Sequence, residues 1–306
     1  MGDVACRWCD AHGTRHHRTR HRSDLSRERY GTHSLLRRRL SIGARNRHAA
    51  EDGVHECLLD GGRLEGMERI RSTDKRMSDP LEERRARARE LAAEFADQGD
   101  AFGWFDAFYK EAAGDNEQIP WADLEPNKFF KTWADDVGLK GNGRKALVVG
   151  CGLGDDAKYL DDLGFKVMAF DISPTAIEWA KRLHADKDIQ FEVADLFEPH
   201  RSWLGAFDFV LEIYTIQPLP MDMRERVIDS IATFVASEGE LVIVTRGRGD
   251  DEEPVELPWP LSRRDLSRFE THGLQQMDFR TFDGDEETPI PRWVVWYKKS
   301  TVTEVE

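Results

Sequence analysis

The chain has 306 residues, of which 40% are hydrophobic and 33% are charged, a composition that fits one large soluble domain or two smaller ones. Its formal net charge of -14 argues against binding to nucleic acid, because phosphate contacts come from lysine and arginine. No apolar run approaches the length of about 18 residues that spans a membrane, so we expect no membrane contact. Four cysteines are too few for a disulfide framework and favour a reducing, cytoplasmic location.

The composition changes near Met77. Residues 1–76 hold 17 Lys+Arg and 11 Asp+Glu, whereas residues 77–306 hold 27 and 47. The first segment has sixteen arginines but a single lysine, and its apolar residues follow neither a helical nor a strand period. We therefore expect little packed structure in residues 1–76.

Three interpretations of this first segment are open. We favour translated upstream DNA, with Met77 as the native start, because of the arginine bias. A transit peptide is the second interpretation, since residues 1–50 hold twelve arginines and four acids. The third is a small metal site at Cys6 and Cys9, but the following histidines come too soon for a zinc finger. A disordered tail explains these residues better than a metal site does.

Residues 77–140 carry helical patterns. The stretch DPLEERRARARELAAEFADQ predicts a helix with Asp79 as its N-cap and Pro80 at its first position. A second helix follows in DAFGWFDAFYKEAA, where four aromatic residues share one face. A third is expected from Lys128 to Asp136, ending before Gly138.

Strand and helix patterns alternate through residues 141–300. The expected strands are KALVVG, KVMAF, IQFEV, FDFVLEIY, ELVIVTR, LQQMDFRTF and RWVVWYKK. Helices are expected from Asp156 to Leu163, in SPTAIEWAKRLHA behind a Ser173 cap, from Asp222 to Ala236, and in SRRDLSRFETHG. This alternation predicts an α/β sheet with helices on both faces.

A glycine-rich loop follows the first of these strands, in ALVVGCGLGDD. Gly150, Gly152 and Gly154 open the next helix, and Asp171 stands at the end of the second strand, 21 residues after Gly150. This register is typical of nucleotide binding, in which the glycines approach the ligand and the acid holds ribose hydroxyls.

The acids after the glycines restrict the ligand. In a dinucleotide-binding loop the third small residue packs near a pyrophosphate at the helix N-terminus. Asp155 stands at that position and Asp156 follows it, so two carboxylates would repel a pyrophosphate. The loop favours a nucleoside that carries positive charge and no phosphate, and S-adenosylmethionine fits this description.

The motifs resemble those of class I S-adenosylmethionine-dependent methyltransferases. ALVVGCGLG, FDIS, VADLFE and FDFVLEIY match the first four motifs of that class, over roughly residues 120–299. More narrowly, GCGLGDD, FDISPTAIEWA, FDFVLEIYTIQPLP and the upstream PWADLEPNKFF resemble the thiopurine and halide/thiol methyltransferase branch. The resemblance implies a Rossmann-like, mostly parallel sheet of seven strands. It also implies that the helices of residues 77–140 form an N-terminal cap over the cofactor and substrate site.

The resemblance also implies roles for individual residues. The glycine loop would approach the methionyl part of the cofactor, Asp171 with Ile172 beside it would hold the ribose, Asp195 would reach the adenine amino group, and Leu196 would lie beside the ring. Trp121 would help to cover the cofactor. Val148 departs from the class, in which an acid often stands two residues before the first glycine. Support for the methionyl ammonium must then come from Asp156, Glu212 or backbone carbonyls.

The expected chemistry is methyl transfer to a small-molecule acceptor, which we take to be a thiol or a related soft nucleophile. Such a displacement needs alignment and desolvation more than acid–base help. If an amine or hydroxyl needs a base, Glu212 and Tyr214 are the candidate catalytic residues, with Asp155 also available. We expect a monomer without a metal. Two alternatives stay open: a regulatory module that binds S-adenosylmethionine without catalysis, and a nicotinamide-dependent dehydrogenase.

Overall fold

The computed structural model describes residues 79–284 and 290–301. The expectations for residues 1–76, including the Cys6 and Cys9 pair, lie outside this part. The described strands form one sheet of seven in the order β3-β2-β1-β4-β5-β7-β6. Pairing is parallel from β3 through β5, and β7 runs antiparallel to both of its neighbours. The mostly parallel, Rossmann-like sheet expected from the sequence is confirmed.

The helices and strands follow the expected chain order. The helices are α1 (Pro80–Asp97), α2 (Gly103–Ala112), α3 (Lys128–Val137), α4 (Asp155–Asp162), α5 (Pro174–Leu183), α6 (Arg224–Phe234) and α7 (Arg263–Ser267). The strands are β1 (Lys145–Val149), β2 (Lys166–Asp171), β3 (Ile189–Val193), β4 (Phe207–Ile213), β5 (Val235–Arg246), β6 (Leu274–Phe282) and β7 (Arg292–Lys299). Short 3₁₀ turns precede α6 at Met221–Met223 and follow α7 at Arg268–His272.

Local signals explain most of these boundaries. The side chain of Asp79 accepts a hydrogen bond from the backbone N–H of Leu81, and that of Ser173 accepts one from Ala176, so both expected N-caps are confirmed. Gly138 ends α3 in a left-handed conformation. The helix expected from Asp222 to Ala236 is shorter, because its last residues already belong to β5. The SRRDLSRFETHG stretch is α7 followed by a 3₁₀ turn rather than one helix.

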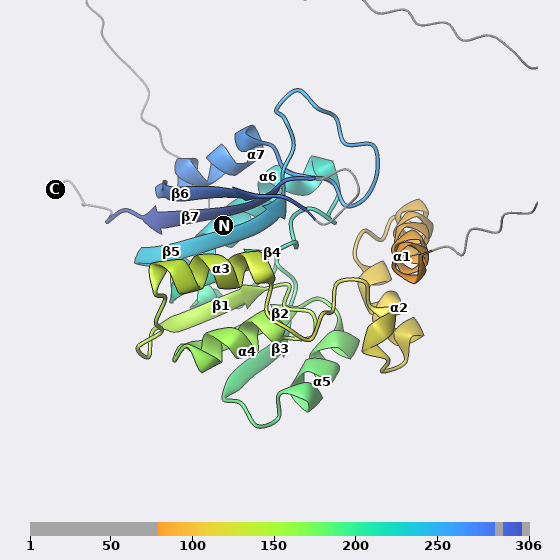
Figure 1. Cartoon of the computed structure of the whole chain (residues 1–306), viewed down its shortest axis with the longest axis horizontal. Coiled ribbons are helices and arrows are strands. Elements are labelled where there is room, and N and C mark those ends of the chain that lie inside the picture. Colours follow the sequence, from red (N-terminus) through yellow and green to blue (C-terminus); the bar gives the residue numbers. More distant parts are fainter. Residues whose placement is uncertain (1–78, 285–289, 302–306) are drawn as a thin grey trace, which may run out of the picture. The chain divides into compact units, whose positions relative to one another are not determined.

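Two apolar layers cover the sheet. On one face α3, α4 and α5 bury Trp133, Leu160 and Ile177 against alternate strand residues such as Val148. On the other face α6 buries Ile228 and its neighbours, together with the region of α7. Figure 1 shows these two sets of helices on opposite sides of the strands. The continuous apolar run of β1 is therefore explained by burial on both faces.

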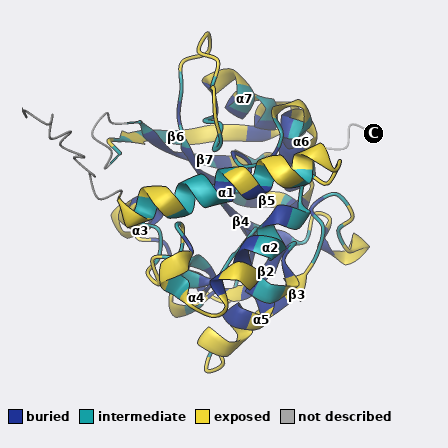
Figure 2. Ribbon diagram, turned by 90° about the vertical axis from the view of Figure 1, so that its right-hand side faces the viewer, coloured by how far each residue is buried: buried dark blue, intermediate teal, exposed yellow. Residues whose placement is uncertain are grey.

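The helices α1 and α2 lie beyond the carboxyl ends of the parallel strands (Figure 1). They pack on one another and on α5 through a separate apolar cluster that includes Leu91, Phe108 and Trp179. Figure 2, turned by 90°, shows α1 crossing in front of the strand ends, with much of its length exposed or half-buried. None of the described helices is long and apolar enough to cross a membrane.

Candidate functional site

A cavity of about 1900 Å³ opens at the carboxyl ends of the strands. Its lining comes from α1, α2, the loop before α3, the glycine loop, the ends of β2 and β4, and the long connection after β5. Open α/β sheets bind their ligands at this edge. No histidine is present among the described residues that line it.

The glycine loop begins the lining at the end of β1. Gly150 and Gly154 have φ angles of 60° and 88°, in the region that favours glycine. A Cβ on Gly150 would lie 2.4 Å from Oγ1 of Thr215, and one on Gly154 would lie 2.8 Å from the Phe191 ring. Gly150 and Gly152 line the cavity, whereas Gly154 is the N-cap of α4 and does not.

Asp171 lies at the end of β2, facing the glycine loop. Its carboxylate accepts hydrogen bonds from the backbone N–H of Gly152 and of Ser173, each 2.9 Å long. Burial raises the pKa of Asp171, while these backbone donors oppose the rise. The side chain lines the cavity and thus links the loop to the position expected for a ribose. A carboxylate has about four lone-pair sites, so Asp171 can still accept from a ligand hydroxyl beside its backbone donors.

The other predicted cofactor residues line the same end of the cavity. Ile172 follows Asp171, and Asp195 and Leu196 follow β3. The carboxylate of Asp195 accepts a 2.8 Å hydrogen bond from the backbone N–H of Phe197, which fixes the turn after the strand. Leu196 is buried in the core below this turn. The structure therefore brings together the residues predicted for ribose and adenine.

Two acids at the start of α4 also line the cavity. Burial raises the pKa of Asp155 to about 6, and the carboxylate of Asp123 adds to the rise. Burial raises the pKa of Asp156 to about 7, although its Oδ1 accepts a 2.8 Å hydrogen bond from the backbone N–H of Asn127. Near neutral pH the pair therefore carries less negative charge than the sequence argument assumed.

Trp121 lines the cavity and is 40% exposed. Its indole Nε1 donates a 2.8 Å hydrogen bond to the hydroxyl of Tyr109, and its ring lies 5.1 Å from that of Phe108. The Tyr109 hydroxyl lies so close to Gly152 that an added Cβ there would be 3.0 Å away. Tyr109 thus connects Trp121 to the loop. The aromatic stripe of α2 was its only signal in the sequence.

Glu212 and Tyr214, the two predicted catalytic residues at the end of β4, differ in their access to the cavity. Glu212 is fully buried and is not among the residues that line the cavity. Its Oε1 accepts hydrogen bonds from the backbone N–H of Thr215, at 2.6 Å, and of Ile216, at 3.0 Å. Burial raises its pKa to about 7, and Oε2 has no hydrogen-bond partner among the described residues. Glu212 therefore holds the turn after β4.

Tyr214 lies within this turn and lines the cavity. Its φ of 58° is unusual for a residue that is not glycine. Burial raises the pKa of the phenol, whereas the guanidinium groups of Arg292 and Arg246 and a hydrogen bond with Asn127 lower it. The turn held by Glu212 thus directs Tyr214 toward two arginines that were not among the residues predicted for the site.

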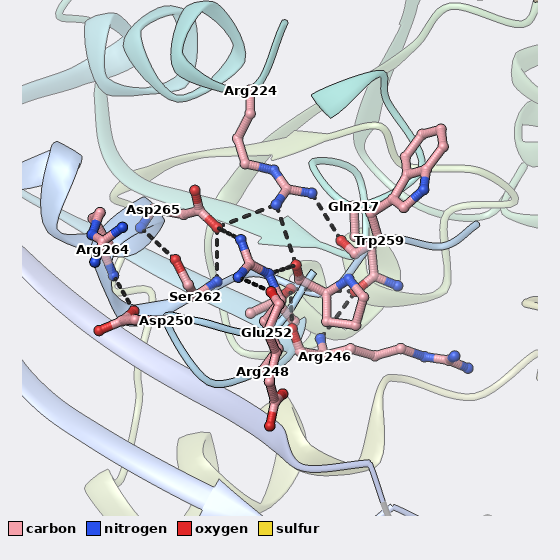
Figure 3. Close-up of polar contacts among 12 residues, drawn as sticks. Gln217, Arg224, Arg246, Arg248, Asp250, Glu252, Trp259, Ser262, Arg264 and Asp265 are labelled. Carbon is pink, nitrogen blue, oxygen red and sulfur yellow. Dashed lines mark hydrogen bonds and ion pairs between the residues drawn. The ribbon is translucent and has the colours of Figure 1, made fainter. Parts of the chain in front are cut away.

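The connection after β5 is held by a network of charges. Arg224 and Arg248 place guanidinium nitrogens 3.2 and 3.3 Å from Oδ2 of Asp265, and both donate to the carbonyl oxygen of Pro260 (Figure 3). Most residues of the stretch from Glu252 to Pro260 line the cavity. This acidic stretch is therefore part of the cavity wall. The structure shows that its base is fixed.

No group of three or more His, Cys, Asp or Glu residues that could hold a metal is present in residues 79–284 and 290–301.

Comparison with known proteins supports the resemblance to methyltransferases. Residues 146–239 match the model of a methyltransferase domain. The chain is 24% identical over 150 residues to a 2-heptyl-1-hydroxyquinolin-4(1H)-one methyltransferase of Mycobacteroides abscessus, a match that covers 48% of this chain and 64% of that protein. The chain thus spans less than two thirds of that relative.

Two solved structures share the fold. One comes from work on the conversion of a disulfide bond into a thioacetal group during echinomycin biosynthesis, with a TM-score of 0.53, 19% identity, and coverage of 65% of this chain and 92% of that one. The other is a magnesium protoporphyrin IX methyltransferase from Synechocystis PCC 6803 with bound S-adenosylhomocysteine, with a TM-score of 0.51, 14% identity, and coverage of 64% and 98%.

Residues 146–239 therefore match a methyltransferase domain in sequence, and the described region has the fold of class I S-adenosylmethionine-dependent methyltransferases. S-adenosylmethionine is the cofactor of this class. None of these similarities selects the thiopurine and halide/thiol branch.

Proposed function

We propose that the protein transfers a methyl group to a small organic acceptor by direct displacement. The observation that carries this proposal is that a single cavity contains both the glycine loop with Asp171 and the side chain of Tyr214. Cofactor and acceptor can therefore meet at the end of β4. S-adenosylmethionine supplies a methyl group activated by its sulfonium, so the protein needs chiefly to align the reactants and exclude water.

The residues present fit this cofactor. Asp171 and Asp195 offer carboxylates for ribose hydroxyls and an adenine amino group, with Ile172 and Leu196 as apolar neighbours. Asp123, Asp155 and Asp156 lie near the glycine loop, where a methionyl ammonium would find them. A cation there favours the ionised carboxylates and lowers their raised pKa values. Trp121 supplies an aromatic cover.

The acceptor enters from the side of α1 and the connection after β5. A thiol or another soft nucleophile remains our first choice, because it needs no base. The relative from Mycobacteroides abscessus is named for a hydroxyquinolone, and an acidic hydroxyl is the second choice. We assign Tyr214 to the acceptor, since its side chain lines the cavity, and we assign Glu212 to the support of the Tyr214 turn.

Calorimetric titration with S-adenosylhomocysteine and with NAD and NADP tests the cofactor assignment. We expect binding of the first at micromolar level or better, and no measurable binding of the other two at pH 8, where Asp155 and Asp156 are charged. NAD binding without a response to S-adenosylhomocysteine would overturn the proposal in favour of a dehydrogenase.

A methyl-transfer assay on thiols and acidic hydroxyl compounds then tests catalysis. Turnover supports the enzyme. Cofactor binding without turnover on any compound supports the alternative, a regulatory module. A cytoplasmic monomer stays our prediction for the protein in the cell, which gel filtration with light scattering and cell fractionation can check.

A further inference from the structure

Two arginines lie side by side at the acceptor end of the cavity. Arg246 ends β5 and Arg292 begins β7, and the antiparallel register pairs them directly. Directly paired residues project from the same face of a sheet, where like charges destabilise the pair. Both residues line the cavity, and Arg292 is only 7% exposed. An anion placed between them would be attracted by both guanidinium groups.

Their surroundings fix the side chain of Arg292 and the backbone of Arg246. Arg292 donates a 2.6 Å hydrogen bond from Nη1 to the carbonyl oxygen of Ile290 and interacts with the phenol of Tyr214. The backbone N–H of Arg246 donates to Oε1 of Gln217 at 2.9 Å. Arg246 is the last residue of β5, two residues before Arg248. In Figure 3 its side chain extends away from the network that Arg248 makes around Asp265.

The arginines also make further polar contacts. This does not exclude a ligand, because each guanidinium has five N–H donors. The cavity also has acidic lining from α1 and from the loop after β5, such as Glu83 and Glu252. An anionic ligand would have to replace some of the polar contacts that the two arginines already make. The site would therefore be more selective for its ligand than a site with two unpaired cations.

The charges of the two ends suit two different reactants. Acids gather at the glycine loop, where a cationic cofactor is expected. Arg246 and Arg292 lie at the β5–β7 end beside Tyr214, although glutamates of α1 and of the loop after β5 also line the cavity. Ile290 and Pro291, which precede Arg292 in the chain, add apolar lining at this end. This arrangement matches a positive cofactor facing a negative acceptor that has an apolar body.

We propose that the methyl acceptor binds as an anion, an ionised hydroxyl or thiol on a small apolar framework, with its charge held by Arg246 and Arg292 beside Tyr214. This inference rests on the proposed methyltransferase function and specifies its substrate class. It also explains how a cavity whose described lining contains no histidine uses acceptors of moderate acidity, because the arginines favour the ionised form.

The chemistry balances without a base in the site. The acceptor loses its proton to solvent before or during binding. Its lone pair then forms the bond to the methyl carbon, the carbon–sulfur bond breaks, and that electron pair returns to sulfur. The negative charge of the acceptor and the positive charge of the sulfonium both disappear. The arginines therefore contribute to binding and ionisation rather than to the displacement itself.

Binding of matched probes to the protein saturated with S-adenosylhomocysteine tests this assignment. The probes are 4-nitrophenol, 4-nitrothiophenol and 1-hydroxyquinolin-4(1H)-one, which are ionised at about pH 8, and their neutral counterparts 4-nitroaniline and quinolin-4(1H)-one. We expect at least one anion to bind tenfold or more tightly than its neutral counterpart. Equal binding of anions and neutral compounds, or no binding by any anion, would overturn the proposal.

Variants assign the preference to the arginines. Arg292→Gln and Arg246→Gln should each reduce the preference for the anion about tenfold or more, and Arg292→Lys should retain part of it, since lysine keeps the charge without the fork. Arg280→Gln is the control, because Arg280 pairs with Asp278 and Asp136 and is not among the residues that line the cavity.

The affinity for S-adenosylhomocysteine separates the possible failures. If it is unchanged in all four variants, the fold and the cofactor site are intact and the anion data decide. If Arg292→Gln weakens S-adenosylhomocysteine as much as it weakens the anion, the arginines hold the cofactor carboxylate instead, and the inference is wrong. If the unaltered protein does not bind S-adenosylhomocysteine, it is the proposed function that fails.

Discussion

The two ends of the cavity are built from the chain in different ways. The cofactor end comes almost entirely from one stretch, from the glycine loop through Leu196, in which a predicted binding residue lies at the end of each strand or within two residues of it. The acceptor end is assembled from α1, the turn after β4, the connection after β5 and the start of β7. The first end is therefore encoded locally in sequence, whereas the second depends on the docking and register of distant segments.

The largest expected effect is at the cofactor end. Gly150→Ala would place a Cβ 2.4 Å from Oγ1 of Thr215, on a backbone with φ of 60°. We expect a loss of S-adenosylhomocysteine affinity of roughly a hundredfold or more, since the loop must shift. Gly205→Ala is a matched control, because Gly205 has φ of 63° but no atom within 4 Å of an added Cβ. Equal affinity in both variants would show that the loop tolerates the side chain.

Asp171 is the next test of the same end. Asp171→Ala removes the proposed ribose contact, and charge-assisted hydrogen bonds of about 1.5–3 kcal/mol correspond to an affinity loss of roughly ten- to hundredfold. It also removes the acceptor for Gly152 and Ser173, so the melting temperature should fall. Asp171→Asn keeps one oxygen and should lose less of both. Titration and thermal unfolding measure the two effects separately, and unchanged affinity would exclude Asp171 from the site.

The cofactor end of the cavity could be predicted from the sequence, whereas most of the acceptor end could not. The strands and their order along the chain were readable because apolar runs, caps and glycines act over a few residues. Asp171 and Asp195 were readable because they lie at or just after the carboxyl ends of strands. The pairing of Arg246 with Arg292 could not be predicted, because the register between β5 and β7 depends on contacts between the two strands and not on the sequence of either one. The contact of Tyr109 with Trp121 depends likewise on how α2 docks.

The sequence predicted the positions of the acidic residues better than their ionisation. The sequence places Asp155 and Asp156 at the loop exit, but burial, which only the fold reveals, raises their pKa values to about 6 and about 7. The repulsion expected against a pyrophosphate is therefore strongest above pH 7. Selectivity against NAD should weaken as the pH falls through this range.

A smaller effect is expected at the acceptor end from Tyr214. Tyr214→Phe removes the hydroxyl that interacts with Arg292 and Asn127 but keeps the ring. We expect kcat/KM to fall about tenfold, with S-adenosylhomocysteine affinity unchanged, because the interaction serves the acceptor. Tyr159→Phe is the control, since its hydroxyl bonds to Asp135 at the surface. Weakened cofactor binding in Tyr214→Phe would instead make the two ends of the cavity one functional unit.

The smallest effect on activity is expected from Glu212, which supports the acceptor end from below its surface. Glu212→Gln keeps an oxygen for the backbone N–H groups of Thr215 and Ile216, so the Tyr214 turn should survive and turnover should stay within a few-fold. A hundredfold loss would instead mark Glu212 as a catalytic base. The exposed Glu192, changed to Gln, is the control.

The stability of the same variant has a pH signature. Burial raises the pKa of Glu212 from its ordinary 4.5 to about 7 in the folded state. Below pH 4.5 the Glu212 carboxyl is protonated in both the folded and the unfolded protein. Between the two values the unfolded chain ionises while the folded protein stays protonated, so stability falls as pH rises, and the loss is complete above pH 7, at about 3 kcal/mol. Urea unfolding at pH 5 and pH 8 should show a smaller fall in Glu212→Gln than in the unaltered protein or in Glu192→Gln. Equal falls in all three proteins would mean that Glu212 is already ionised in the folded state and that its buried charge is balanced in another way.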